Sequence, residues 1–305
     1  MPTIKTEPEQ RTLPFDKAIL LKNVTCVYCG TRLDEGNDSK EHVVGRRFVP
    51  PGALNKKWNL IVRACRKCNA AKADLEDEIS AVSMQPDAFG VFPCNSAGYA
   101  AEARRKAFGA RSRITGNRVG MSAPSLSFRL RSHSGALSYN VTGPPQVESA
   151  RVMELARMHI VAFFYHATYR PSDSAGRFWR GNFVMLSEER RANWGDFRHL
   201  AFMNAVVGWE PRFLAYDPNE YFNIVLRKHP SADCWSWAME WNKSFRIIGF
   251  CGDPNASEAV YSKFPQVPVR KIWLDDGSCV ATKPDRPLRE SEDRLFFWEA
   301  VERTD

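Results

Sequence analysis

The spacing of apolar and polar residues predicts a compact unit between residues 24 and 82. Three elements are expected in it: strands at Glu41–Val43 and Trp58–Val62 and a helix at Ala70–Val82. The helix carries Leu75, Ile79 and Val82 at positions i, i+4 and i+7, so these side chains form one stripe. We expect this stripe to pack on the two strands.

A second set of patterns begins at Ser125. Helical spacing predicts two helices, at Val147–Tyr169 and Ser187–Val207. Short apolar runs separated by turn residues predict four strands: Tyr221–Leu226, Cys234–Trp241, Ser244–Phe250 and Val269–Leu274. Successive short strands of this kind favour an antiparallel meander.

Changes in composition divide the chain into four parts. We predict a polar lead-in at 1–23, the compact module at 24–82, a Gly-, Pro- and Ser-containing basic linker at 83–120, and a C-terminal domain at 121–305. The expected fold class is α+β: a small strand–strand–helix module followed by a separate α+β domain with antiparallel strands.

Charge is unevenly distributed along the chain. The formal net charge is +8, and residues 1–120 hold 20 basic against 13 acidic side chains. This excess predicts a polyanionic partner that is bound by the front of the chain. The chain lacks an apolar run of roughly 20 residues and its start lacks the apolar region of a secretory signal, so we expect a cytoplasmic protein without membrane attachment.

Two C-x-x-C pairs, Cys26/Cys29 and Cys65/Cys68, are separated by 35 residues. Four thiolates suit a tetrahedral structural Zn²⁺, and in a reducing compartment a metal site is favoured over disulfides. Simple burial of the cysteines remains an alternative, whereas a thioredoxin-like role would require a βαβ pattern that is not seen. The other cysteines are isolated and are predicted to be buried thiols: Cys94, Cys234, Cys251 and Cys279.

The segment between and after the cysteine pairs contains Glu41-His42-Val43, Asn59-Leu60-Ile61-Val62 and Cys68-Asn69-Ala70-Ala71-Lys72. With both cysteine pairs, this order resembles the HNH endonuclease family, in its variant with a four-cysteine zinc and a final Asn. The resemblance covers about residues 24–82 and implies a ββα-metal module. Two positions depart from the common pattern, because Asn69 stands where His is usual and Glu41 where Asp is more frequent.

The resemblance implies a role for each of four residues. His42 would be the general base, and Glu41 and Asn69 would hold a catalytic Mg²⁺ or Mn²⁺, since oxygen ligands favour hard cations. Asn59 would orient the His42 loop through side-chain hydrogen bonds. Plainer interpretations stay open: Glu41 as a surface charge, Asn69 as a helix N-cap and Asn59 as a turn cap.

Basic side chains flank the predicted site. Five are predicted to contact nucleic acid, with a solvated charged face as the alternative: Arg46, Arg47, Lys56, Lys57 and Lys72. His159 and His166 lie seven apart without acidic or cysteine partners, so we expect ordinary core or surface histidines. The tryptophans of one strand are expected in the core and not in a base-stacking platform: Trp235, Trp237 and Trp241.

These observations lead to a functional hypothesis. We expect a metal-dependent endonuclease that cuts or nicks DNA, double-stranded DNA in preference to RNA. The family analogy adds a setting in prokaryotic anti-phage defence or restriction, with partner proteins of such a system. Two alternatives remain: a non-catalytic, zinc-stabilised DNA-binding module, and a nuclease gated by a ligand or partner that the C-terminal domain senses.

Overall fold

The computed structural model describes most of the chain: residues 11–12, 17–54, 59–132, 135–178, 181–217, 219–265, 270–273, 279–282 and 285–297. Two of the predicted nucleic-acid contacts, Lys56 and Lys57, lie outside the described residues, as does Trp58. No helix in the described ranges is long and apolar enough to cross a membrane.

The N-terminal module is a three-stranded sheet with one helix. Its strands, in the order β2-β4-β3, are β2 (Ala18–Leu20), β4 (Asn59–Cys65) and β3 (Asp38–His42). β3 is antiparallel to β4, as a strand–strand–helix module requires, and β2 adds a parallel edge strand from the predicted lead-in. Helix α1 (Arg66–Ser83) follows β4 without a loop, so the second cysteine pair lies at the junction of strand and helix.

A larger sheet forms the second layer, in the order β1-β8-β9-β10-β11-β7. Its strands are β1 (Arg11–Thr12), β8 (Glu210–Tyr216), β9 (Phe222–Lys228), β10 (Cys234–Trp241), β11 (Phe245–Gly252) and β7 (Asn182–Arg190). β9, β10 and β11 form three strands of the predicted antiparallel meander. The strand predicted at Val269–Leu274 is not part of it, because β12 (Arg270–Trp273) pairs with β13 (Cys279–Thr282) in a separate two-stranded sheet. β8, which was not predicted, and β7 extend the meander in antiparallel fashion, and β1 is parallel to β8. The mixed α+β class with an antiparallel sheet is therefore confirmed.

The helix predicted at Ser187–Val207 is wrong in its first half. Residues up to Arg190 belong to β7, where Glu188 lies opposite Ile247 of β11. A 3₁₀ turn follows at Arg191–Asn193, and helix α4 spans only Phe197–Val206. Glu188 pairs with a residue of β11 that is nearly sixty positions further along the chain. The spacing of neighbouring residues cannot predict such a pairing.

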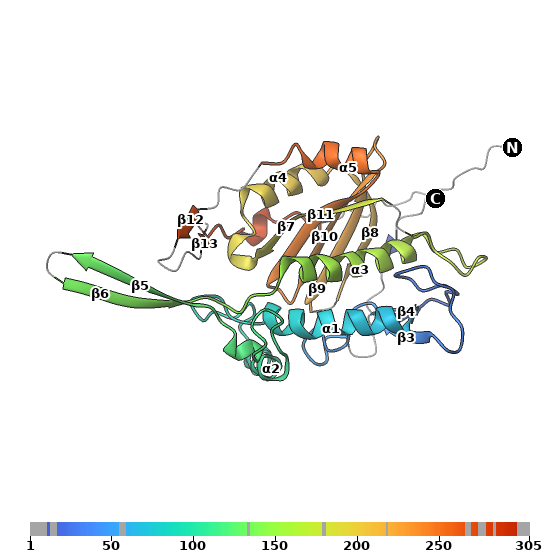
Figure 1. The fold of residues 1–305 in the computed structure, drawn as a ribbon. Coiled ribbons are helices and arrows are strands. Elements are labelled where there is room, and N and C mark those ends of the chain that lie inside the picture. The colour runs from blue at the N-terminus through green and yellow to red at the C-terminus, as the bar shows by residue number, and fades with distance from the viewer. Residues whose placement is uncertain are drawn as a thin grey trace.

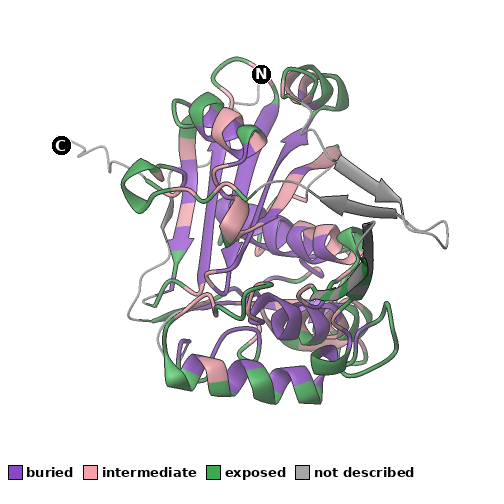
Figure 2. Cartoon of the chain, turned by 90° about the vertical axis from the view of Figure 1, so that its left-hand side faces the viewer, coloured by how far each residue is buried: buried purple, intermediate pink, exposed green. Residues whose placement is uncertain are grey.

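Helices cover both faces of the larger sheet (Figure 1). Helix α3 (Ser149–Ala167) lies beside α1, between the sheet and the N-terminal module, whereas α4 and α5 (Pro254–Tyr261) pack on the opposite face. One apolar core includes Val62 from β4, Phe163 from α3 and Trp237 from β10. The predicted module and C-terminal domain therefore share a core, and Figure 2 shows β10 and β11 buried within it.

The predicted basic linker, 83–120, contains folded structure. Helix α2 (Ala97–Gly109) packs against α1, and a 3₁₀ turn at Val119–Met121 packs against both. A hairpin of β5 (Ser125–Ser132) and β6 (Gly135–Thr142) then projects from the body (Figure 1). The described elements are completed by β12 (Arg270–Trp273), β13 (Cys279–Thr282) and a 3₁₀ turn at Glu290–Glu292.

Candidate functional site

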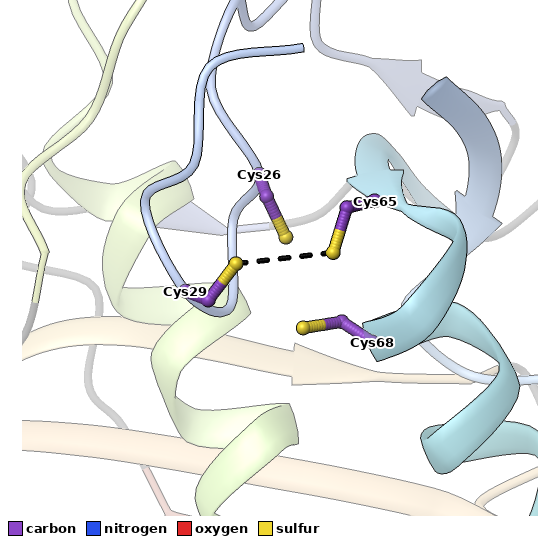
Figure 3. Close-up of side chains that lie close together, drawn as sticks. All are labelled: Cys26, Cys29, Cys65 and Cys68. Atoms are coloured by element: carbon purple, nitrogen blue, oxygen red, sulfur yellow. Dashed lines mark hydrogen bonds between the residues drawn. The ribbon is translucent and has the colours of Figure 1, made fainter. Parts of the chain in front are cut away.

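The four cysteines of the two C-x-x-C pairs converge on one point (Figure 3). Their sulfur atoms all lie within 4.8 Å of one another, and the Cys29 and Cys65 Sγ atoms are 3.8 Å apart. A tetrahedron with Zn–S bonds of ~2.3 Å separates its sulfurs by about 3.8 Å, so the cluster fits zinc. Among the residues that the structure describes, no other three or more His, Cys, Asp or Glu side chains bring their ligand atoms close enough together to hold one metal ion.

Local chemistry at Cys29 suits a metal ligand. Burial raises the pKa of Cys26 and of Cys68. Burial also acts to raise the pKa of Cys29, but hydrogen bonds with Thr31, Cys26 and Cys68 lower it to about 7. A thiol with this pKa loses its proton readily, and zinc binds the thiolate. The two pairs come from a turn before β3 and from the β4–α1 junction, so a bound ion would tie these segments together.

A cleft of about 800 Å³ contains the second candidate centre, and His42 lies in it at the end of β3. Its lining comes from β3, the following turn, α1 and α2, and it includes five cationic side chains: Lys40, Arg46, Arg47, Arg105 and Lys106. Asn69 of α1 also borders the cleft. Three carboxylates also line the cleft: Glu41, Glu76 and Asp77. The cleft thus joins His42 and Asn69 with a surface on which basic side chains outnumber acidic ones.

His42 is held as a neutral ring. Its Nε2 accepts two hydrogen bonds from the Arg46 guanidinium, from Nε at 3.2 Å and from Nη2 at 3.1 Å. Because Arg46 can only donate, Nε2 carries no proton in this arrangement. Burial, followed by the positive charge of Arg46, lowers the pKa of His42 below its usual 6.5. At neutral pH the imidazole is therefore uncharged, which is the form that a general base requires.

Asn59 fixes the chain just after His42. It is buried at the start of β4, where its Oδ1 accepts from the Val44 amide at 3.4 Å and its Nδ2 donates to the Val44 carbonyl at 2.8 Å. Both hydrogen bonds go to the backbone of one residue, so they set the direction in which the chain leaves β3. This is the contact that orientation of the His42 loop would need.

Glu41 and Lys72 form a buried ion pair. The Glu41 Oε1 lies 2.8 Å from Lys72 Nζ and accepts from the Tyr28 hydroxyl at 3.2 Å. Lys72 Nζ also lies 2.6 Å from Glu76 and donates to the His42 carbonyl at 3.3 Å, and its side chain is 1% exposed. Lys72 is therefore not on the surface where a polyanion could reach it, contrary to its predicted role.

Asn69 also has protein partners. Its Nδ2 donates to Ser39 Oγ at 3.0 Å and to the Lys40 carbonyl at 3.4 Å, so it links α1 to β3. The N-cap of α1 is Cys65, and the alternative of an Asn69 cap is not observed. Because the Glu41 carboxylate is paired with Lys72, Glu41 and Asn69 do not form a ready site for Mg²⁺ or Mn²⁺, and that cation stays a prediction.

Helix α2 supplies cleft residues that sequence reasoning assigned to a linker. Lys106 is buried, and its Nζ donates to the carbonyls of Arg47 and Phe48, the latter at 3.3 Å. Burial lowers the pKa of Lys106 to about 8. The basic cluster Arg104–Lys106 was a visible signal, but its helix is rich in alanine and has no strong apolar stripe.

The remaining predictions concern two arginines at the cleft and the histidines and tryptophans expected in the core. Arg46 and Arg47 are exposed and border the cleft, as nucleic-acid contacts would require. The core interpretation is confirmed for the histidines of α3 and the tryptophans of β10, all of which are buried: His159, His166, Trp235, Trp237 and Trp241.

Comparison with protein-family models, curated proteins and solved structures finds no match to this chain. The resemblance to HNH endonucleases therefore depends on the residues of this chain alone. What the structure itself establishes is a four-cysteine cluster that can bind a metal, in a mixed α+β fold.

Proposed function

We propose that the chain is an endonuclease of the HNH type that hydrolyses phosphodiester bonds in DNA, with His42 as its general base. One observation carries this proposal: a neutral, half-buried His42 lies in a cleft with an excess of basic side chains, in the same module as a cysteine cluster that fits zinc. Residues with that order and spacing led to the resemblance with HNH enzymes. Zinc held by the four cysteines would serve the fold, because a closed four-thiolate site leaves no position for a substrate.

Substrate binding would begin at the exposed arginines. Arg46 and Arg47 can pair with phosphate oxygens, which supply most of the sequence-independent affinity for DNA. A phosphate bound by Arg46 competes with the hydrogen bonds that Arg46 gives to His42 Nε2. Binding would thereby release the lone pair of Nε2 at the moment when the phosphodiester is in place.

The released His42 nitrogen can then take a proton from water. The resulting hydroxide attacks phosphorus and the arginines stabilise the added negative charge. The bond to the 3′ oxygen breaks, and the departing 3′ oxygen takes a proton from solvent water. A 5′-phosphate and a 3′-hydroxyl are the products. Asn59 contributes by holding the backbone of Val44. A bound Mg²⁺ or Mn²⁺, the cation expected from the resemblance, would add charge stabilisation at the phosphoryl and 3′ oxygens.

Cleavage of supercoiled plasmid by the zinc-loaded protein tests the proposal. His42→Ala should lose roughly 10²–10⁴-fold in rate, the usual contribution of a general base, while its zinc content and DNA affinity stay close to those of the wild type. His229→Ala, which alters a histidine at the end of β9, is the matched control and should cleave normally. Parallel reactions with Mg²⁺, with Mn²⁺ and with neither show whether a second cation takes part.

A second candidate function is DNA binding without cleavage. The observation in its favour is the pairing of Glu41 with Lys72, which leaves the predicted hard-cation ligand occupied. In that case the wild-type protein would retain salt-dependent DNA affinity but would cleave no faster than His42→Ala under any metal condition. That outcome would replace the nuclease proposal.

A further inference from the structure

The turn that follows His42 carries the two exposed arginines, and all its apolar side chains are buried. We call residues 43–49 the arginine turn. Within it, Val43, Val44, Phe48 and Val49 are each at most 1% exposed. The module itself holds this turn through Asn59, as described above, and through Glu76 of α1, which accepts a hydrogen bond from the Gly45 amide at 2.9 Å.

Phe48 connects the arginine turn to the C-terminal part of the chain. Its ring makes edge-to-face contacts with His159 of α3 at 5.7 Å and with Trp241 of β10 at 5.4 Å between ring centroids. Such contacts add to the apolar burial of the ring. Phe48 is therefore packed against α3 and β10, which both lie outside the module.

Asn242 makes a polar contact at the same place. This residue lies in the tight turn between β10 and β11, is fully buried, and has a left-handed backbone with φ of 53°. Its Nδ2 donates to the Phe48 carbonyl at 3.1 Å and to Ser83 Oγ at 2.9 Å. Its own carbonyl accepts from the Tyr99 hydroxyl of α2 at 2.9 Å. One side chain and one carbonyl thus join the larger sheet to the arginine turn, α1 and α2.

We propose that Asn242 is a positioning residue through which the C-terminal sheet holds the arginine turn and orients Arg46 for phosphate and for His42. This inference rests on the proposed function, and it specifies how the C-terminal part takes part in it. The buried Asn242 amide donates to the main chain of Phe48, two residues after Arg46. A shift of the β10–β11 turn, for example when a ligand binds the sheet, would change that contact and the arrangement of the arginines together.

The neighbouring residue provides a matched control. Lys243 occupies the same turn with the same left-handed backbone, at φ of 58°, but its ammonium lies 3.9 Å from Glu220 and over the ring of Tyr221. Glycine accepts a left-handed backbone without strain, so Asn242→Gly and Lys243→Gly both keep the turn. Only the first variant removes the hydrogen bonds to Phe48 and Ser83.

Amide hydrogen exchange measures the contact without requiring any activity. Asn242→Gly should accelerate exchange at Gly45 and Phe48 by about tenfold, the effect of losing one or two net hydrogen bonds, whereas Lys243→Gly should leave them unchanged. Amides at the cysteine pairs should be unaffected in both. Unchanged exchange at Gly45 and Phe48 in Asn242→Gly, or an equal acceleration in both variants, would overturn the proposal.

A second variant covers the case in which Asn242→Gly loosens the whole chain. Asn242→Asp tolerates the left-handed backbone and keeps the side-chain shape, but its carboxylate cannot donate to the Phe48 carbonyl. It must reproduce the faster exchange at Gly45 and Phe48, and normal exchange there overturns the proposal.

Kinetics then separate positioning from a purely structural role. Because the arginines bind phosphate and also stabilise the charge added in the reaction, Asn242→Gly should lower kcat/KM for DNA about tenfold, through a higher KM together with a lower kcat. A fall in kcat with unchanged KM contradicts the proposal. If the wild-type protein does not cleave DNA at all, the proposed function fails while the exchange measurement still decides the role of Asn242.

Discussion

The cysteine cluster and the His42 cleft lie in the same module but are built in different ways. The cluster needs only two short segments, each with its pair of ligands two residues apart, brought together by the β3–β4 pairing and by the start of α1. The cleft needs β3, α1 and α2, and its turn is held from the C-terminal sheet as well. The module therefore contains a metal centre built from short sequence segments and a catalytic candidate built from elements far apart in the sequence. The two should respond differently to mutation.

Loss of the cysteine cluster should have the largest effect. Purified protein should contain about one Zn²⁺ per chain, and Cys65→Ser should unfold residues 24–82, because structural zinc contributes about 10 kcal/mol or more to the folding of small domains. Elemental analysis and thermal unfolding provide the measurement. Cys94→Ser, outside the cluster, should keep its zinc and its stability. A folded, zinc-free wild type would show that the four thiols have no metal role.

Removal of the buried Lys72 ammonium should cause the second-largest loss of stability. Lys72→Met leaves the Glu41 and Glu76 carboxylates without their shared cation, and unpairing a buried charge costs about 3–5 kcal/mol. Urea unfolding should show this loss, with Lys67→Met, an exposed lysine of the same helix, close to the wild type. Zinc content should be normal in both. Equal stability of the two variants would mean that the buried pair contributes nothing.

Acid should lower the free energy of unfolding by a smaller amount than the Lys72 substitution does, through protonation of His159. Burial lowers the pKa of His159 from 6.5 to about 4, although Glu76, whose carboxylate lies 3.6 Å from His159 Nε2, opposes this. The unfolded chain binds the proton first, so stability decreases as pH falls from about 6.5 to about 4, by up to ~3 kcal/mol.

His159→Phe tests this pH dependence. Phenylalanine cannot be protonated and has no ring nitrogens to satisfy, so this variant should lose less stability between pH 7.5 and pH 4.5 than the wild type does. Unfolding free energies at several pH values supply the measurement, and His229→Gln should keep the wild-type slope. An unchanged slope in His159→Phe would assign the acid sensitivity to other groups.

Prediction from sequence succeeded where neighbouring residues determine the outcome. The C-x-x-C spacing predicts two ligands for one metal, and the four cysteines do converge. The apolar stripe of α1 is buried as expected, and Leu75 and Ile79 join the core with the strands, whereas Val82 packs in a separate cluster with Ala107 and Val119. The prediction was wrong for residues 187–190, which were expected to begin a helix. This run of polar residues belongs to the end of β7, where it pairs with β11. Helix α2 was missed because alanines and arginines give no clear periodicity.

The sequence by itself determined the cysteine cluster, the order of strand, strand and helix around it, and the three meander strands β9, β10 and β11, since each depends on spacing within a short window. The tertiary structure alone decided where charge resides in the candidate site. It placed Lys72 in the interior between Glu41 and Glu76, brought Lys106 from α2 to the arginine turn, and set Asn242 against Phe48. The longest of these contacts joins Asn242 and Phe48, which are 194 positions apart, and the packing of the module against the sheet brings them within hydrogen-bond distance.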